Sequence, residues 1–366
     1  MEPGKISERQ LAFLMVTVLI TTAIFWAPQL ACRAVEQDAW ITAHMASVWG
    51  ILSVLVIIAL ARRYPGLTLI EYLPLILGKP LGKIFGALYI FWFLSQGAVI
   101  ILQFAYFLNI TLMPNTPTAV FMVTVIALCF YALRSGLEVW ARVNEILLFI
   151  AVLTIVAVIV LPFDNMDFSR LLPLADHSPG QLIYTSTNSA SWRGEVIIAG
   201  MFIPALASFR HTPRNLIISV VLVGFIVAAV EISAVAVFGG VLTGQKEFPF
   251  FSLARMISIA RIFDRLEVLI VITLLLGTFF KICAFLYCST LGAAQVFGFK
   301  DYQFLLLPLS VLMLALANNF FRGIPDMTDF LTHVFPGTAL FSAELVIPLF
   351  LYLIAIFRPL KQVKES

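Results

Sequence analysis

Long apolar runs separated by short polar stretches repeat along almost the whole chain. An α-helix needs about 20 mainly apolar residues to cross the hydrocarbon core of a bilayer, and most of the runs here approach or exceed that length. Their order predicts an all-α integral membrane protein with ten transmembrane helices. The expected helices cover residues 11–28, 40–61, 84–112, 118–133, 143–161, 179–206, 215–241, 266–296, 303–320 and 338–357.

The sixth expected helix differs from the others because its outer half is polar and its middle is charged. A polar run comes first and the apolar run 196–206 comes last. Between them lie Trp192, Arg193, Gly194 and Glu195. Lipid offers no hydrogen-bond partners, so such groups at mid-depth indicate a helix that breaks and unwinds beside a water-filled cavity. Many transporters build a small-solute site at such a break. The polar run contains Thr185, Ser186, Thr187, Asn188, Ser189 and Ser191.

Composition agrees with a membrane protein and excludes several functions. Hydrophobic residues make up 61% of the 366 residues and charged residues 12%, with a mean hydropathy of +1.02. A soluble domain rarely tolerates this balance, and the net charge of +3 is too small to indicate a polyanionic partner. The sequence shows no nucleophile–base constellation and no metal-ligand pattern. We therefore expect a protein of the lipid bilayer that is not an enzyme, with no metal, no other cofactor and no nucleic-acid partner.

The distribution of lysine and arginine predicts the orientation of the helices. With the N-terminus inside, fourteen of these residues fall in inner segments and seven in outer segments, and Arg193 and Lys281 lie within the membrane. Cytoplasmic loops carry an excess of lysine and arginine in membrane proteins. The bias and the even number of helices therefore place both termini in the cytoplasm.

The two halves of the chain show a weak symmetry. The first helix carries the patch 21–23 before Pro28, and the sixth carries Gly194 before Pro204. Five helices repeated in inverted orientation produce this arrangement, with broken helices one and six flanking the site. We expect one polytopic domain over residues 1–366, with repeats at approximately 8–162 and 179–357.

Several loop motifs resemble those of a known family. They are 78–84 (GKPLGKI), 112–117 (LMPNTP), 131–142 (YALRSGLEVWAR) and 247–250 (EFPF), the last followed by Arg255 and by 265–267 (RLE). In this order they resemble the spore germinant-receptor B-subunit family, within the amino acid–polyamine–organocation transporter superfamily. The resemblance runs from Ile6 to the last helix.

This resemblance implies a fold, a function and partners. The fold is the LeuT-like bundle of ten helices in a five-plus-five inverted repeat. The function is to sense a small nutrient, typically an amino acid, that triggers spore germination. The partners are the A subunit, a membrane protein with soluble ligand-binding regions, and the C subunit, a lipoprotein. The location is the inner membrane of the spore, that is, a bacterial cell membrane.

The resemblance also points to the site residues in helices one and six. A Gly-Ser/Thr-Gly-Ile motif before a proline in helix one corresponds here to Thr21, Thr22, Ala23 and Ile24 before Pro28, so both glycines are replaced. An aromatic residue followed by Gly-Glu in helix six corresponds to Trp192, Gly194 and Glu195. Glycine lets backbone N–H groups approach a ligand carboxylate closely, so the replacements bear on which ligand fits.

The expected site combines these residues with polar side chains of helices three and eight. The ligand-binding candidates are Thr21, Thr22, Ala23, Ile24, Gln96, Ser191, Trp192, Arg193, Gly194 and Thr278. The candidates for a proton or charge relay, or for a structural ion pair, are Glu195, Lys281, Glu231 and Glu344. An unpaired charge at the centre of a membrane helix costs about 2.5–3.5 kcal/mol or more, so each charged side chain needs a partner.

Two other functions are compatible with the same residues. One is a proton-coupled amino-acid permease in which Glu195 or Lys281 carries the coupling charge. The other is a ligand-gated conduit for water or ions. Uptake of labelled solute into vesicles separates the permease from the receptor, and poorly saturable flux identifies the conduit.

Overall fold

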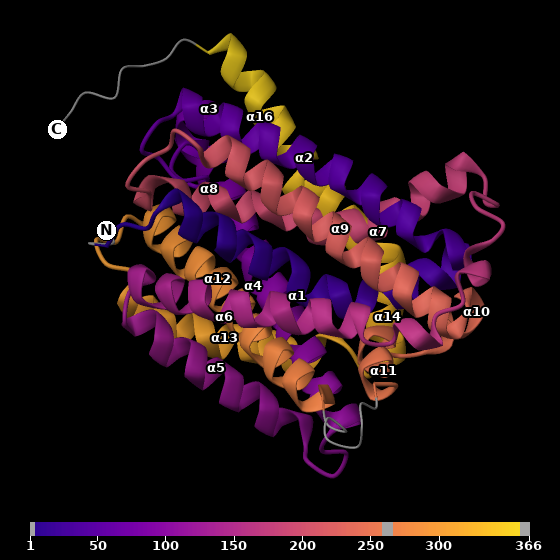
Figure 1. Cartoon of the computed structure of the whole chain (residues 1–366). Helices are drawn as coiled ribbons and strands as arrows, with labels where there is room; N and C mark the ends of the chain where they lie inside the picture. Colours follow the sequence, from indigo (N-terminus) through magenta and orange to yellow (C-terminus); the bar gives the residue numbers. More distant parts are fainter. Residues whose placement is uncertain (1–3, 258–265, 359–366) are drawn as a thin grey trace.

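The computed structural model describes residues 4–257 and 266–358, and within these ranges the chain is almost entirely helical (Figure 1). The helices are α1 (Glu8–Val35), η1 (Glu36–Asp38), α2 (Ala39–Arg63), α3 (Leu73–Leu77), α4 (Lys79–Thr111), α5 (Thr118–Arg134), α6 (Leu137–Val160), η2 (Phe163–Asn165), η3 (Phe168–Leu171), α7 (Pro179–Gly194), η4 (Glu195–Ile198), α8 (Ala199–Phe202), η5 (Ile203–Ala205), α9 (Thr212–Phe238), α10 (Gly240–Gln245), α11 (Pro249–Arg255), α12 (Leu266–Phe297), η6 (Gln303–Leu305), α13 (Leu306–Phe320), α14 (Ile324–Asp329), η7 (Phe330–Val334), α15 (Phe335–Thr338), η8 (Ala339–Glu344) and α16 (Val346–Phe357).

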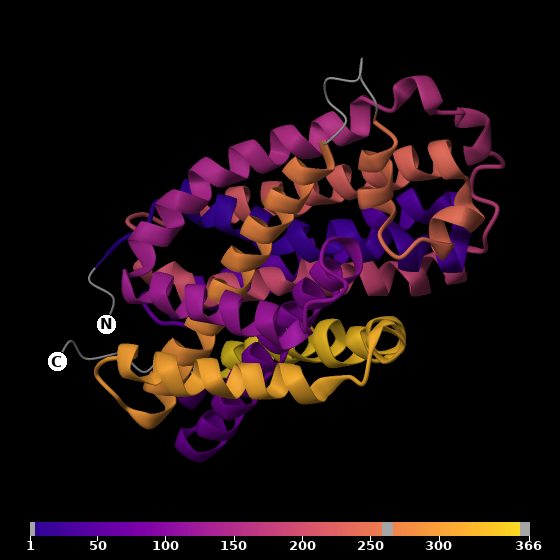
Figure 2. The same cartoon turned by 90° about the horizontal axis from the view of Figure 1, so that it is seen from below.

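The helices form two groups that pack on each other (Figures 1 and 2). In the first group α2 contacts α7 and α9, and α1 contacts α7 and α9. In the second group α4 contacts α5, α12 and α13. Since α1 of the first group also contacts α12 of the second, the two groups meet at α1. The helix α6 packs on both α1 and α12.

Seven segments of the described chain are long and apolar enough to cross a membrane. The first, Glu8–Arg63, contains both α1 and α2, which are joined by the short η1. The apolar helix α5 is shorter, and the polar α7 is not among the seven. A multi-pass all-α protein is therefore confirmed, while the number ten, the single domain and the inverted repeats 8–162 and 179–357 stay predictions.

The first transmembrane helix is continuous, so the expected break in helix one is wrong. Ser7 and Gln10 form a capping box at its start, and Pro28 lies inside the helix. At the expected break Thr21 donates its hydroxyl hydrogen to the carbonyl oxygen of Thr17 at 2.6 Å. Threonine and alanine, where the family motif has glycine, lack the backbone freedom that favours a break.

The sixth helix changes type at the expected position but does not unwind. α7 ends at Gly194, the 3₁₀-helix η4 begins at Glu195, and two further short helices carry the chain to Ala205. Gly194 and Glu195 keep right-handed helical backbone angles and are buried. The expectation of an unwound backbone facing water is therefore wrong, because the chain tightens from α to 3₁₀ geometry instead.

The last span begins earlier than expected and contains two π-helical segments. Its first helix starts at Ile324 rather than at residue 338, because Pro325 occupies a first-turn position that needs no backbone N–H. The segments η7 (Phe330–Val334) and η8 (Ala339–Glu344) are both π-helical. A π-helical turn is rare and often marks a functional site.

Candidate functional site

A lysine of α12 joins α12 to α1 and to the start of η4, where the sixth helix changes type. The Lys281 Nζ lies 2.6 Å from Oε2 of Glu195, the first residue of η4. It also donates a hydrogen bond of 2.7 Å to Oγ1 of Thr22 in α1. All three side chains are buried. One ammonium group thus brings together α1, α12 and the start of η4, which lie in the first, eighth and sixth helices expected from the sequence.

A second buried base, Arg193, lies one residue before the end of α7. Arg193 has no exposed surface, and its guanidinium interacts electrostatically with Glu231 of α9 and with Glu195. Its three side-chain nitrogens make no hydrogen bond to the described chain, nor do the carboxylate oxygens of Glu231. Gly50 of α2 creates the space, since a Cβ added there would lie 2.7 Å from Cβ of Arg193.

A third acid, Glu344, packs directly on Gly194 at the end of α7. A Cβ added to Gly194 would lie 2.0 Å from Oε2 of Glu344, which ends the π-helical η8. Glu344 is fully buried and neither of its oxygens has a hydrogen-bond partner among the described residues. Together with Arg193, Glu195, Glu231 and Lys281 it forms a cluster of five buried ionisable groups, which we call the charged cluster.

The polar outer half of α7 is mostly bonded to its own helix. Ser186, Thr187 and Ser191 each donate a hydrogen bond to a carbonyl oxygen three or four residues earlier. The amide of Asn188 lies against the carbonyl oxygens of Leu331 and Thr332 in η7, and its nitrogen placed there donates to both at 3.0 Å. Asn188 thus joins α7 to the last span, whereas the three hydroxyl groups are satisfied within α7. These side chains account for much of the polarity that the sequence assigned to a water-filled cavity.

Next to Lys281 the structure contains a small void between α1, α4 and α12. Its polar lining comes from Thr22, Gln103 and Thr278, and its volume is about 10 Å³. A space of this size holds at most one water molecule. The aromatic rings of Trp26, Phe25, Phe104, Phe107 and Phe248 make up most of the remaining lining, together with Leu274.

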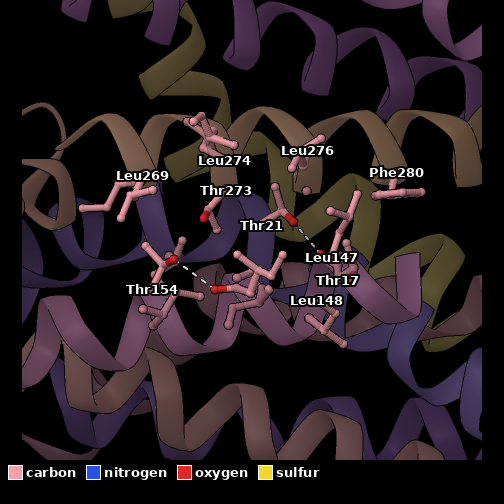
Figure 3. Close-up of a pocket in the computed structure, with 18 of the residues that line it drawn as sticks. Thr17, Thr21, Leu147, Leu148, Thr154, Leu269, Thr273, Leu274, Leu276 and Phe280 are labelled. Atoms are coloured by element: carbon pink, nitrogen blue, oxygen red, sulfur yellow. Dashed lines mark hydrogen bonds between the residues drawn. The ribbon is translucent and has the colours of Figure 1, made fainter. Parts of the chain in front are cut away.

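A larger chamber of about 200 Å³ lies between α1, α6 and α12 (Figure 3). Side chains of α12 line one side and those of α6 the other, and Thr17 and Thr21 of α1 lie between them. The lining is mostly apolar, with a few hydroxyl groups and the amide of Asn144. Gly277 allows close contact of α12 with α1, since an added Cβ would lie 2.6 Å from Oγ1 of Thr21.

The predicted ligand-binding residues do not all face one space. Thr22 and Thr278 line the small void, whereas Thr21 and Ile24 line the chamber. The remaining candidates are buried in the bundle, and the ring of Trp192 packs on Phe335 with centroids 5.6 Å apart. These remaining candidates are Ala23, Gln96, Ser191, Trp192, Arg193 and Gly194.

Three residues that line the two spaces are not among the candidates chosen from the sequence, although Gln103 was expected to share a helix face with the chosen Gln96. Gln103, one heptad after the chosen Gln96, lines the void, and its Nε2 has no hydrogen-bond partner in the described chain. Phe248 covers the void from the loop before α11, within a motif used only for the family resemblance. Asn144 lines the chamber, and its polar side chain within the expected helix 143–161 was the signal that could have found it.

Comparison with known proteins places this chain in a family. The sequence profile of the family described as "Spore germination protein" matches residues 5–320. Spore germination protein KB of Bacillus subtilis (strain 168) is 26% identical over 376 residues, covering 100% of this chain and 98% of that protein. Spore germination protein YndE of the same strain is 25% identical and covers 86% of this chain and 88% of that protein.

A solved structure shares the fold. It is that of Mhp1, a transporter of the nucleobase–cation-symport-1 family, in a closed conformation with bromovinylhydantoin bound. The TM-score is 0.68 at 15% identity, covering 90% of this chain and 74% of that chain. The likeness confirms the predicted LeuT-like fold class of an integral membrane protein.

Proposed function

Since this chain belongs to the spore germination protein family, we propose that it is the membrane subunit of a spore germinant receptor that binds a small nutrient and signals germination. The observation that carries the proposal is the meeting of Thr22, Glu195 and Lys281 beside the small void. This meeting joins three helices of a transporter fold at one buried point. A ligand that binds there acts on all three helices at once.

The nutrient is recognised by side chains rather than by a broken first helix. Because α1 is continuous, its backbone groups are hydrogen-bonded within the helix and are not free to bind a carboxylate. Thr22, Gln103 and Thr278 instead supply donors and acceptors suited to an amino acid or another small polar solute. The charged cluster supplies groups of both signs for a zwitterion.

Binding requires the bundle to open. A void of about 10 Å³ excludes an amino acid, so the aromatic side chains over it must separate first. The ligand then stabilises an open arrangement at the expense of the closed one, which is a shift of population. This coupling turns nutrient binding into a change of shape that partner subunits can detect.

The partners and location follow from the family resemblance. We infer that the A and C subunits of the receptor bind this chain in the spore inner membrane. The contacts at the two ends of the described chain support termini on one side of the membrane, and the distribution of lysine and arginine predicts that this side is the cytoplasm. Ile6 pairs with the backbone after the sixth helix, and the carbonyl oxygen of Arg358 accepts a hydrogen bond of 2.9 Å from Arg63.

The test is a ligand screen of the purified chain by thermal unfolding. Single amino acids, sugars and nucleosides are added in turn, and a ligand that binds the folded state raises the unfolding temperature. Thr278→Val removes one buried hydroxyl of the void and should abolish most of the shift. The matched control is Thr124→Val, since that exposed hydroxyl only bonds the carbonyl of Val120 in its own helix.

Two results would contradict the proposal. One is the absence of a shift with every nutrient of the screen. The other is a shift of equal size in both threonine variants, which would place the ligand away from the void. Saturable uptake of the same nutrient into vesicles containing this chain alone would identify a permease instead.

A further inference from the structure

The chamber between α1, α6 and α12 contains a buried amide without a partner. Asn144 of α6 lines the chamber and is 1% exposed. Neither its Nδ2 nor its Oδ1 makes a hydrogen bond to the described chain. Buried polar groups are nearly always hydrogen-bonded, because an unmade bond leaves the desolvation of the group uncompensated. This amide can therefore pair with a group that enters the chamber.

The chamber can be reached from the lipid. Leu269, Ile272 and Ile150 contribute to its lining and are each about half exposed at the outer surface of the bundle. The wall that they form belongs to α6 and α12, and α6 is among the most apolar and least buried candidate spans of the described chain. A molecule dissolved in the hydrocarbon region meets this wall directly.

The lining defines the chemistry of the occupant. None of the lining residues is ionisable, so a charged ligand would lie unpaired in apolar surroundings at a high cost. A lipid acyl chain would fit the apolar walls but would leave the amide of Asn144 unpaired. The combination favours a neutral molecule that is mostly apolar and carries one group that both donates and accepts hydrogen bonds.

We propose that this chamber is a second binding site, which takes a small neutral amphiphile from the bilayer and pairs its polar group with Asn144. An apolar cavity of roughly 150 Å³ binds benzene, so a chamber of about 200 Å³ suits a single ring with a short polar substituent. The site is separate from the charged cluster, and the proposal does not depend on the identity of the nutrient.

The chamber lies beside the helices that surround the small void, so its occupant acts on their contacts. Thr21 lines the chamber, and the next residue, Thr22, accepts the hydrogen bond from Lys281. A ligand in the chamber lies against both α1 and α12, where Gly277 keeps the two helices close. It therefore changes how readily these helices separate.

The experiment compares benzamide, toluene and benzoate as probes of the purified chain in nanodiscs, with affinities measured by ligand-observed NMR. Benzamide should bind at least about tenfold more tightly than either of the others. Asn144→Leu, which keeps the size of the side chain, should weaken benzamide about tenfold and leave toluene within about twofold. Ala151→Phe, which fills the chamber, should abolish binding of both.

Matched controls separate this site from partition into the lipid. Val156→Phe adds the same ring to α6 at an exposed position outside the chamber lining and should change neither affinity. Equal binding of benzamide by the wild type and Asn144→Leu would overturn the proposal. If Ala151→Phe does not fold, the leucine variant alone decides, because its prediction is a change in the ratio of two affinities.

Discussion

The ammonium of Lys281 and the carboxylate of Glu195 lie 2.6 Å apart, with neither side chain exposed. The contact joins the middle of α12 to the first residue of the 3₁₀ segment in the sixth helix. Removing one partner of such a pair leaves a buried charge without compensation, which costs more than losing the attraction itself. The pair therefore holds the closed arrangement of the two helix groups together.

The losses of stability caused by replacing Lys281 and Glu195 one at a time should not add up to the loss in the double variant. Lys281→Met and Glu195→Gln should each lower the free energy of unfolding by about 3–5 kcal/mol, and the double variant by clearly less than their sum. The measurement is reversible unfolding in detergent micelles. The exposed pair Arg142 and Glu138, treated in the same way, should change stability by no more than about 1 kcal/mol. Additive effects in the buried pair would show that the two charges act independently.

Glu344 should tolerate neutralisation better than Glu195. The charged cluster contains three acids and two bases, so one carboxyl group is in excess among the described side chains. Lys281 already contacts Glu195, whereas both oxygens of Glu344 lack a hydrogen-bond partner. Glu344→Gln should therefore lower the free energy of unfolding by less than about 1 kcal/mol. A loss as large as that of Glu195→Gln would show that Glu344 is an essential ionised partner of Lys281.

Gly194→Ala should be destabilising because no side chain fits at that point of the bundle. The added Cβ would lie 2.0 Å from Oε2 and 2.9 Å from Cβ of Glu344, so the last span must move. Overpacking of this kind costs about 1–3 kcal/mol. Adding Glu344→Ala should restore much of the loss in a thermal unfolding assay. Gly180→Ala is the control in the same helix, since an added Cβ there meets no atom within 4 Å.

The connection between α1 and α2 should respond to acid. The buried carboxylate of Asp38 accepts hydrogen bonds from the main-chain nitrogens of Ala175 and His177 at 2.8 and 3.1 Å, and His177 Nδ1 lies 2.9 Å from it. Burial by itself would raise the pKa of Asp38. The hydrogen bonds outweigh burial, so the pKa of this carboxyl lies below its usual value.

A lowered pKa stabilises the fold above the unfolded value of about 3.9 and loses this effect as the pH falls through the folded value. Asp38→Asn should therefore be less stable than the wild type at pH 7, and the difference should shrink below about pH 4. Thermal unfolding at several pH values measures it. Asp164→Asn, at an exposed position, should match the wild type throughout. A deficit of Asp38→Asn that does not change with pH would point to packing instead of charge.

Several features could be predicted from the sequence because they depend on local composition. Hydropathy identified a multi-pass helical membrane protein, and loop motifs indicated the family. The change of helix type falls at the predicted position, because Gly194 and Glu195 interrupt an otherwise regular pattern. The break of helix one was expected from analogy, and the replacement of glycine by Thr21 and Ala23 was the local reason against it.

Which side chains line the site depends on the rotation of each helix about its own axis. A membrane helix is apolar toward lipid and toward its neighbours alike, so hydropathy does not distinguish these two faces. For this reason spacing alone could not show that Gln103 lines the void and that the chosen Gln96, seven residues earlier, does not. The same rotation places Asn144 in a chamber rather than against another helix.

By itself the sequence determined that this chain lies in a membrane, which family it resembles and where its sixth helix changes, since these follow from residues near one another along the chain. Only the tertiary structure decided that Lys281 contacts Glu195 and Thr22, and that the space beside them is lined by aromatic rings. These contacts join residues up to 259 positions apart. Their geometry depends on the packing of whole helices, which no local pattern records.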